Sequence, residues 1–157
     1  VRFVGTAESH GPYIETGEFD AAEVTDAWSL LNQRAAERIL KAAERHHVGI
    51  TVATPIERGL LATGPVAGRE YLNRRYTADL FEHVGKIKTL CDECGVPMNA
   101  AALQWCARHP LVAATIPGAR LPAEATANAA AAEVEIPPGF WRDLDPLVRH
   151  WDVAIFE

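Results

Sequence analysis

Short apolar stretches alternate with longer amphipathic segments along this chain. Four stretches rich in β-branched or small apolar residues predict buried strands over residues 1–7, 21–27, 49–55 and 113–119. Between the second and third, Ile39, Leu40 and Ala43 share one helical face opposite charged side chains. Helices are accordingly predicted over residues 33–47, 77–94, 98–108, 122–133 and 138–148.

The order of these elements predicts an α/β fold. The strands are continuously apolar, which is typical of parallel strands covered by helices on both faces. Four such units either close a small doubly wound sheet or form the last half of an eight-stranded (β/α)8 TIM barrel with a C-terminal helix. Because residue 1 already lies in a strand-like run, the half barrel is favoured, as one unit over residues 1–157. We expect its open edges to pair with an N-terminal half barrel or with a second copy.

Composition narrows the class of protein. The chain has 157 residues, 48% of them hydrophobic, and a formal net charge of −6, as in ordinary globular proteins. It does not begin with Met, so we expect a part of a longer protein. The acidic balance speaks against binding to nucleic acid or to an anionic membrane surface. No apolar run reaches the roughly 18 residues of a membrane span, and no secretory signal is visible, so we expect a cytoplasmic protein.

The most informative chemistry follows the fourth predicted strand. Small residues at its exit, Gly118 and Ala119, would let a ligand approach the backbone, and Arg120 adds a planar cation. A helix begins near Pro122, where unpaired N–H groups attract anions. The stretch therefore suits a phosphate or a ribose. The alternative is a tight loop in which Arg120 is merely solvated.

A second candidate follows the third strand, where Thr54 and Arg58 stand near the strand's exit. Beyond it lies a basic and aromatic segment, interpreted either as a lid over a cofactor or as a plain surface loop. Its residues are Arg69, Tyr71, Arg74, Arg75 and Tyr76.

One further spacing suggests a metal. Cys91 and Cys94 have the spacing of half a metal site, but no second pair is present and both fall on an apolar helix stripe. We therefore expect core cysteines and no metal site.

Several segments, in their order and spacing, resemble the C-terminal half of an aldo-keto reductase. They are VRFVGTA, WSLLNQRAAERIL, HHVGITVATPIERGLLATG and GVPMNAAALQWCARHPLVAATIPGAR, followed by Asn128. Within the family, FDAAEVTDAWSLLNQ is most similar to the branch of dehydrogenases acting on L-fucose or D-threo-aldoses and to the related pyridoxal dehydrogenase.

This resemblance implies a (β/α)8 barrel that binds NADP or NAD and transfers a hydride to or from an aldose or another aldehyde or alcohol. The family's catalytic Asp, Tyr, Lys and His belong to the first four strands, so it implies no catalytic residue in this segment. By motif position, the implied nicotinamide-side residues are Ala7, Glu8, Thr25 and Ala53. Thr54 and Ile56 match the pyrophosphate side. The adenosine-side residues are Gly118, Ala119, Arg120, Glu124 and Asn128.

Departures from the family pattern leave two questions open. The family commonly has Ser, Asn and an aromatic ring where this chain has Ala7, Glu8 and Ala53. This departure supports an alternative, in which the chain is a non-catalytic half barrel that binds a dinucleotide or a partner chain. Glu124 would repel a 2′-phosphate and favour NAD, whereas Arg120 favours NADP.

Overall fold

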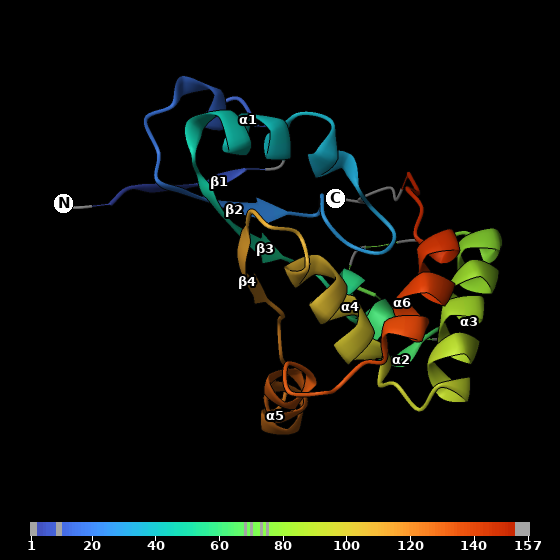
Figure 1. The fold of residues 1–157 in the computed structure, drawn as a ribbon. Coiled ribbons are helices and arrows are strands. Elements are labelled where there is room, and N and C mark those ends of the chain that lie inside the picture. The colour runs from blue at the N-terminus through green and yellow to red at the C-terminus, as the bar shows by residue number, and fades with distance from the viewer. Residues whose placement is uncertain are drawn as a thin grey trace.

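A four-stranded parallel sheet forms the centre of the molecule. The structure, a computed structural model, describes residues 3–8, 11–67, 69, 71–72, 74 and 76–152. The strands are β1 (Gly5–Glu8), β2 (Ala21–Thr25), β3 (Gly49–Ala53) and β4 (Val112–Ile116), and they lie in the order of the chain (Figure 1). All three pairings are parallel, which confirms the predicted α/β class.

Helices connect and cover these strands. They are α1 (Ile39–His46), α2 (Leu60–Thr63), α3 (Ala78–Glu93), α4 (Met98–Ala107), α5 (Pro122–Ala131) and α6 (Pro138–Leu144). Short 3-10 turns occur at Ile14–Thr16, Arg34–Ala36, Glu57–Gly59 and Asp145–Leu147. In Figure 1, α1 lies against the sheet, α2, α3, α4 and α6 gather in a second group, and α5 stands apart below β4. No helix in the described ranges is long and apolar enough to cross a lipid bilayer.

The strands end earlier than the apolar pattern predicts. Strands β2 and β3 stop at Thr25 and Ala53 because Asp26 and Thr54 adopt left-handed backbone conformations, with φ of 54° and 57°. Strand β4 stops at Ile116, before Pro117, which has no N–H to continue the ladder. Strand β1 begins only at Gly5. The apolar runs of β2, β3 and β4 continue into the loops that follow these strands, whereas residues 1 and 2 of the first predicted run lie outside the described residues.

Two predicted helices are also shorter, and one was missed. The segment predicted as a helix over residues 33–47 begins with the turn Arg34–Ala36, and α1 starts only after Arg38, whose φ of −135° is not helical. Helix α6 ends at Leu144, where Pro146 follows in a 3-10 turn. Helix α2 has only four residues, too few to show a helical period in the sequence.

Two hydrophobic clusters support the fold. One lies between the sheet and α1 and is formed mainly by Val24, Ile50, Val52, Ile39 and Leu40. The other joins α2, α3, α4 and α6 through Leu60, Leu61, Val84, Ile87 and Leu144.

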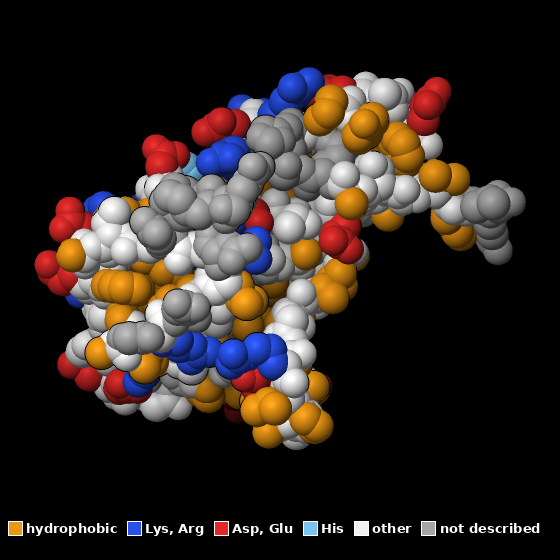
Figure 2. All heavy atoms as spheres, turned by 180° about the vertical axis from the view of Figure 1, so that it is seen from behind, with side chains coloured by type: hydrophobic (Ala, Val, Ile, Leu, Met, Phe, Trp, Pro, Cys, Tyr) orange, Lys and Arg blue, Asp and Glu red, His pale blue; other side chains and the backbone are white. Residues whose placement is uncertain are grey.

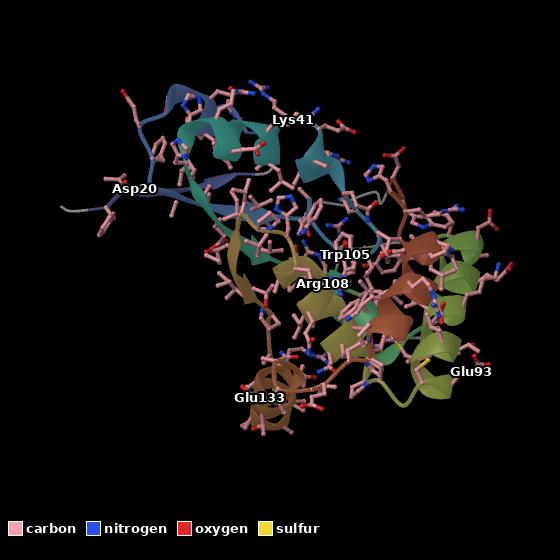
Figure 3. The ribbon with its side chains drawn as sticks, viewed as in Figure 1. Asp20, Lys41, Glu93, Trp105, Arg108 and Glu133 are labelled. Carbon is pink, nitrogen blue, oxygen red and sulfur yellow. The ribbon has the colours of Figure 1, made fainter. Side chains whose placement is uncertain are left out.

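Trp105 of α4 packs against both clusters. Its ring stacks on Trp28 with the ring centroids 5.0 Å apart, and Figure 3 shows it between the sheet and the helices. This aromatic contact is one of those that join the sheet to the helical group, beside the hydrogen bond from the Trp28 indole to the Cys106 carbonyl at 3.3 Å.

The opposite face of the sheet carries small and polar residues. Ala7, Glu23, Thr51 and Ala114 lie side by side in the strand register, and each is exposed or half-buried. A face of this kind is what the inside of a barrel would present before closure, because interior residues alternate with those under the helices.

The expectation of two core cysteines is half wrong. Cys91 is buried, and burial raises the pKa of its thiol to about 11. Cys94 is exposed, because α3 ends at Glu93 and Gly95 turns the chain at a φ of 65°. The apolar stripe is continued by Val96, which is buried.

Truncation of a side chain to alanine should change the free energy of unfolding differently on the two faces of the sheet. Ile50→Ala removes a fully buried side chain beneath α1 and should lower the free energy of unfolding by about 3 kcal/mol. The neighbouring Thr51→Ala, on the half-buried opposite face, should change it by less than about 1 kcal/mol. Urea denaturation of both variants measures the difference. Equal losses would contradict the assignment of the two faces.

Candidate functional site

A cleft of about 610 Å³ opens between the loops that follow β3 and β4. One wall includes Thr54, Ile56 and Arg58, and the other includes Gly118 and Arg120. Because β3 and β4 are parallel neighbours, both loops leave the same end of the sheet. Figure 2 shows a row of Lys and Arg side chains that runs toward the lowest projection of the molecule, where Figure 1 places α5. Ligands of α/β proteins bind at such carboxyl ends of strands.

Thr54 ties the tips of β2 and β3 together. Its hydroxyl accepts a hydrogen bond from the Asp26 N–H at 2.8 Å and donates to the Ala53 carbonyl at 2.7 Å. The backbone takes positive φ values again at Glu57, Arg58 and Gly59. Conformations of this kind cost roughly 1–3 kcal/mol each in residues other than glycine and are found where surrounding structure holds them, as at ligand sites.

Asp26 holds two arginines at this end of the sheet. Its carboxylate contacts the Arg58 guanidinium at 3.1 Å and the Arg74 guanidinium at 2.7 Å. The side chain of Arg74 is 2% exposed, whereas that of Arg58 is 26% exposed and lines the cleft. One arginine therefore belongs to the interior and the other faces the cleft.

These contacts correct part of the prediction for the basic and aromatic segment. Arg74 and Tyr71 are buried, so neither belongs to a surface patch. The Tyr71 hydroxyl donates to the Gly64 carbonyl at 3.1 Å, which anchors the segment. Arg69 lines the cleft, and Arg75 lies outside the described residues. Lid movement stays a prediction.

Glu57 is the acidic residue that sequence reasoning missed. It is 1% exposed, and one of its carboxyl oxygens accepts a hydrogen bond from the Ser29 hydroxyl at 2.5 Å. Its backbone carbonyl accepts from Tyr76 at 3.0 Å. Burial raises the pKa of Glu57, against the opposing effect of the Ser29 hydrogen bond. Burial likewise raises the pKa of Tyr76.

The second wall is organised by Glu124 in the first turn of α5. Its carboxylate accepts hydrogen bonds from the Arg120 backbone N–H at 2.7 Å and from the Arg120 guanidinium at 3.1 Å. These two bonds lower the pKa of Glu124, so it is ionised at neutral pH. Asn128, one turn further, donates to the Gly118 carbonyl at 3.3 Å and so fixes the glycine loop against the helix.

The cleft brings together eight of the eleven residues predicted to contact a cofactor. They are Ala53, Thr54, Ile56, Gly118, Ala119, Arg120, Glu124 and Asn128. Thr25 ends β2 beside Ala53 but does not line the cleft, and Ala7 and Glu8 end β1 one strand further away. The predicted nicotinamide-side residues therefore extend from Ala53, which lines the cleft, across the end of β2 to the end of β1.

Several lining residues carried no signal in the sequence. Thr63 belongs to the short helix α2, Leu72 to the basic segment, and Asn99 to the first turn of α4. Asn99 donates to the Ala127 carbonyl at 3.2 Å and joins α4 to α5. Only tertiary contacts between distant segments reveal such residues.

Metal binding finds no support in the described ranges. No group of three or more His, Cys, Asp or Glu side chains there is arranged to hold an ion.

Comparison with known proteins decides the family. The sequence pattern described as "Aldo/keto reductase family" matches residues 10–149. This chain belongs to the aldo/keto reductase family. It is 32% identical over 132 residues to D-threo-aldose 1-dehydrogenase from Pseudomonas sp, covering 83% of this chain and 40% of that protein. It is 27% identical over 131 residues to pyridoxal 4-dehydrogenase from Microbacterium luteolum, covering 83% and 38%.

The solved structures agree with the barrel prediction. The apo form of aldo-keto reductase AKR11C1 from Bacillus halodurans superposes with a TM-score of 0.70 at 25% identity, covering 99% of this chain and 53% of that one. Its holo form gives a TM-score of 0.71 at 24% identity, covering 99% and 52%. The four strands are thus about half of a TIM barrel, as predicted. The chain spans about two fifths of the curated relatives and about half of the solved aldo-keto reductase.

The buried Glu57 predicts a specific dependence of stability on pH. Because its pKa is higher in the folded than in the unfolded state, the folded state loses stability as the pH rises above about 4.5. Glu57→Gln keeps an acceptor for Ser29 and removes this titration. The stability of the variant relative to the wild type, measured by urea denaturation, should therefore increase as the pH is raised above about 5. The exposed Glu93→Gln serves as control, and a relative stability of Glu57→Gln that is constant with pH would contradict the assignment.

Proposed function

We propose that this chain supplies the cofactor-binding half of an NAD(P)-dependent oxidoreductase that transfers a hydride between the nicotinamide and an aldose or another aldehyde or alcohol. The observation that carries the proposal is the convergence of eight predicted residues on one cleft at the carboxyl ends of β3 and β4. The catalytic Asp, Tyr, Lys and His would come from an N-terminal half barrel. Holding a cofactor in a reactive geometry is itself a substantial part of such catalysis.

The residues of the cleft fit a dinucleotide. A Cβ atom built on Gly118 meets nothing within 4 Å, so the backbone is open to close approach by a ligand. Asn128 uses its amide N–H on Gly118 and keeps its carbonyl oxygen as an acceptor. The Thr54 hydroxyl retains a lone pair for a further donor beside its two hydrogen bonds. We assign the adenosine diphosphate part to this cleft.

A second candidate function is binding of a dinucleotide without catalysis. Ala7, at the position of one of the usual nicotinamide ligands, does not line the cleft. A half barrel that binds a dinucleotide without catalysing hydride transfer would need only the cleft. The similarity to D-threo-aldose 1-dehydrogenase supports the enzyme, and an aldose is the substrate class we propose.

The cleft gives a direct test through glycine substitutions. Gly118→Val fills space that is empty in the protein, so the fold should persist, while affinity for NADH and NADPH should fall at least about tenfold. Gly85→Val, in α3, also meets nothing within 4 Å and lies away from the cleft, which makes it the matched control. Binding is measured by enhancement of nucleotide fluorescence. Unchanged binding in Gly118→Val, or no binding of either nucleotide by the wild type at millimolar concentration, would overturn the proposal.

A second test addresses cofactor preference. Glu124 is ionised, but Arg120 occupies both of its carboxylate oxygens. We propose that this pair weakens NADPH binding relative to NADH, because the carboxylate both repels a 2′-phosphate and holds the guanidinium. Glu124→Gln should raise the affinity for NADPH relative to NADH about fivefold. Glu133→Gln, beyond the end of α5, is the control, and an unchanged ratio in Glu124→Gln would contradict this preference.

A further inference from the structure

The sheet face away from α1, which we call the inner face, carries a single charged side chain in the four described strands. Glu23 stands in the middle of β2, between Ala7 of β1 and Thr51 of β3. The other positions of this face hold glycine, alanine, threonine or isoleucine, at Gly5, Ala21, Thr25, Gly49, Ala53, Ala114 and Ile116. One carboxylate therefore belongs to a face of mostly small, uncharged side chains.

Glu23 has no cationic partner in the described part of the chain. It is exposed, and none of the salt bridges between described residues includes it. Its carboxylate accepts a long hydrogen bond of 3.5 Å from the Thr25 hydroxyl on the same strand. Asp26, three residues later, contacts two arginines. The chain thus neutralises the acid at the end of β2 and leaves the acid in its middle to solvent.

Closure of the sheet into a barrel would bury Glu23. The four strands superpose on about half of a TIM barrel. The inside of such a barrel is filled by side chains from all of its strands and is not an open pore. A buried carboxylate without a counter-charge is strongly unfavourable, whereas a carboxylate paired with a cation is tolerated. The sheet that completes the barrel must therefore bring a positive charge to Glu23.

A second copy of this chain does not offer that charge. In an eight-stranded barrel made of two copies, each strand lies opposite the same strand of the other copy, because the two are four strands apart. The two-fold symmetry of such a dimer would place both Glu23 side chains at one height on facing strands. The inner face of the described strands contains no Lys or Arg. Two like charges enclosed without a cation would oppose association.

We propose that the inner face is an interaction surface for a partner sheet that carries a Lys or Arg side chain opposite Glu23, and that Glu23 selects this partner against a second copy of the chain. The partner is a parallel half barrel of four strands, which would pair with the open edges of β1 and β4. Its second strand would lie opposite β2, so the cation belongs to that strand. Selection by repulsion of the wrong partner is a general route to specificity. This inference does not depend on cofactor binding or on hydride transfer.

Sedimentation equilibrium of the purified chain tests this selection, with Glu23→Lys as the probe for a cationic partner face. Wild type and Glu23→Lys should each self-associate weakly. Their 1:1 mixture should form a heterodimer whose dissociation constant is at least about tenfold lower than that of either homodimer, because a pair of like charges becomes an ion pair. Glu23→Gln removes both facing charges, so it should dimerise more tightly than the wild type.

Glu18→Lys is the matched control, because it makes the same change of net charge outside the sheet. Glu18 is exposed and precedes β2, so a mixture of Glu18→Lys with wild type should associate no more tightly than wild type alone. Folding of the variants is checked by urea denaturation at concentrations where the chain is monomeric. Glu23 is exposed in the single chain, so Glu23→Lys and Glu23→Gln should both keep the wild-type midpoint.

Three results would overturn parts of the proposal. A wild-type homodimer as tight as that of Glu23→Gln would identify a second copy as a suitable partner and remove the selective role of Glu23. A mixture of wild type and Glu23→Lys that is no tighter than the Glu18→Lys mixture would remove the need for a cation. Absence of association in every sample would overturn the inner face as an interaction surface. Loss of nucleotide binding, which tests the proposed function, changes none of these outcomes.

Discussion

The hydrogen bond from the Asp26 N–H to the Thr54 hydroxyl is the constraint on which the site depends. It joins two residues that have just left neighbouring strands and that both have left-handed backbones. With the tips of β2 and β3 tied in this way, the Asp26 carboxylate is directed at Arg58 and Arg74. The position of the β3 loop, and hence of one wall of the cleft, follows from this single junction.

The loop that follows β3 combines a strained backbone with buried charged and polar side chains that hold it. The loop from Thr54 to Gly59 contains three residues other than glycine with positive φ, each of which costs roughly 1–3 kcal/mol. Ion pairs to Asp26 and hydrogen bonds from Ser29 and Tyr76 to Glu57 hold the loop in place. The side chains in these ion pairs and hydrogen bonds are buried or nearly so. Removal of one of them would therefore leave its partner buried without a hydrogen bond or a counter-charge. The cleft is therefore rigid on this side, which favours binding by preorganisation.

Sequence periodicity predicted the alternation of strands and helices because burial under α1 requires apolar residues such as Ile50 and Val52 at fixed positions. The resemblance to aldo-keto reductases further predicts that Gly118 and Asn128 belong to one site. In the structure both residues line one cleft with Thr54, and the binding of a cofactor there stays a prediction. The pattern of apolar residues therefore predicts the order of strands and helices, and the resemblance to the family predicts many of the residues that line the cleft.

What the sequence did not reveal depends on long-range contacts. A run of apolar and small residues does not show that Asp26 turns left-handed and ends a strand. Charged residues are usually exposed, so the sequence does not predict that Glu57 and Arg74 are buried. Their burial depends on partners far away in the chain. Ser29 donates a hydrogen bond to Glu57, and Asp26 forms an ion pair with Arg74. Cys94 was misplaced for the converse reason, since its helix ends one residue before it.

A crystal structure of the protein with ADP-ribose tests the central claim most directly. We expect the ligand between the loops that follow β3 and β4, its pyrophosphate beside Thr54 and its adenosine beside Gly118 and Asn128. A ligand bound outside this cleft would contradict the account.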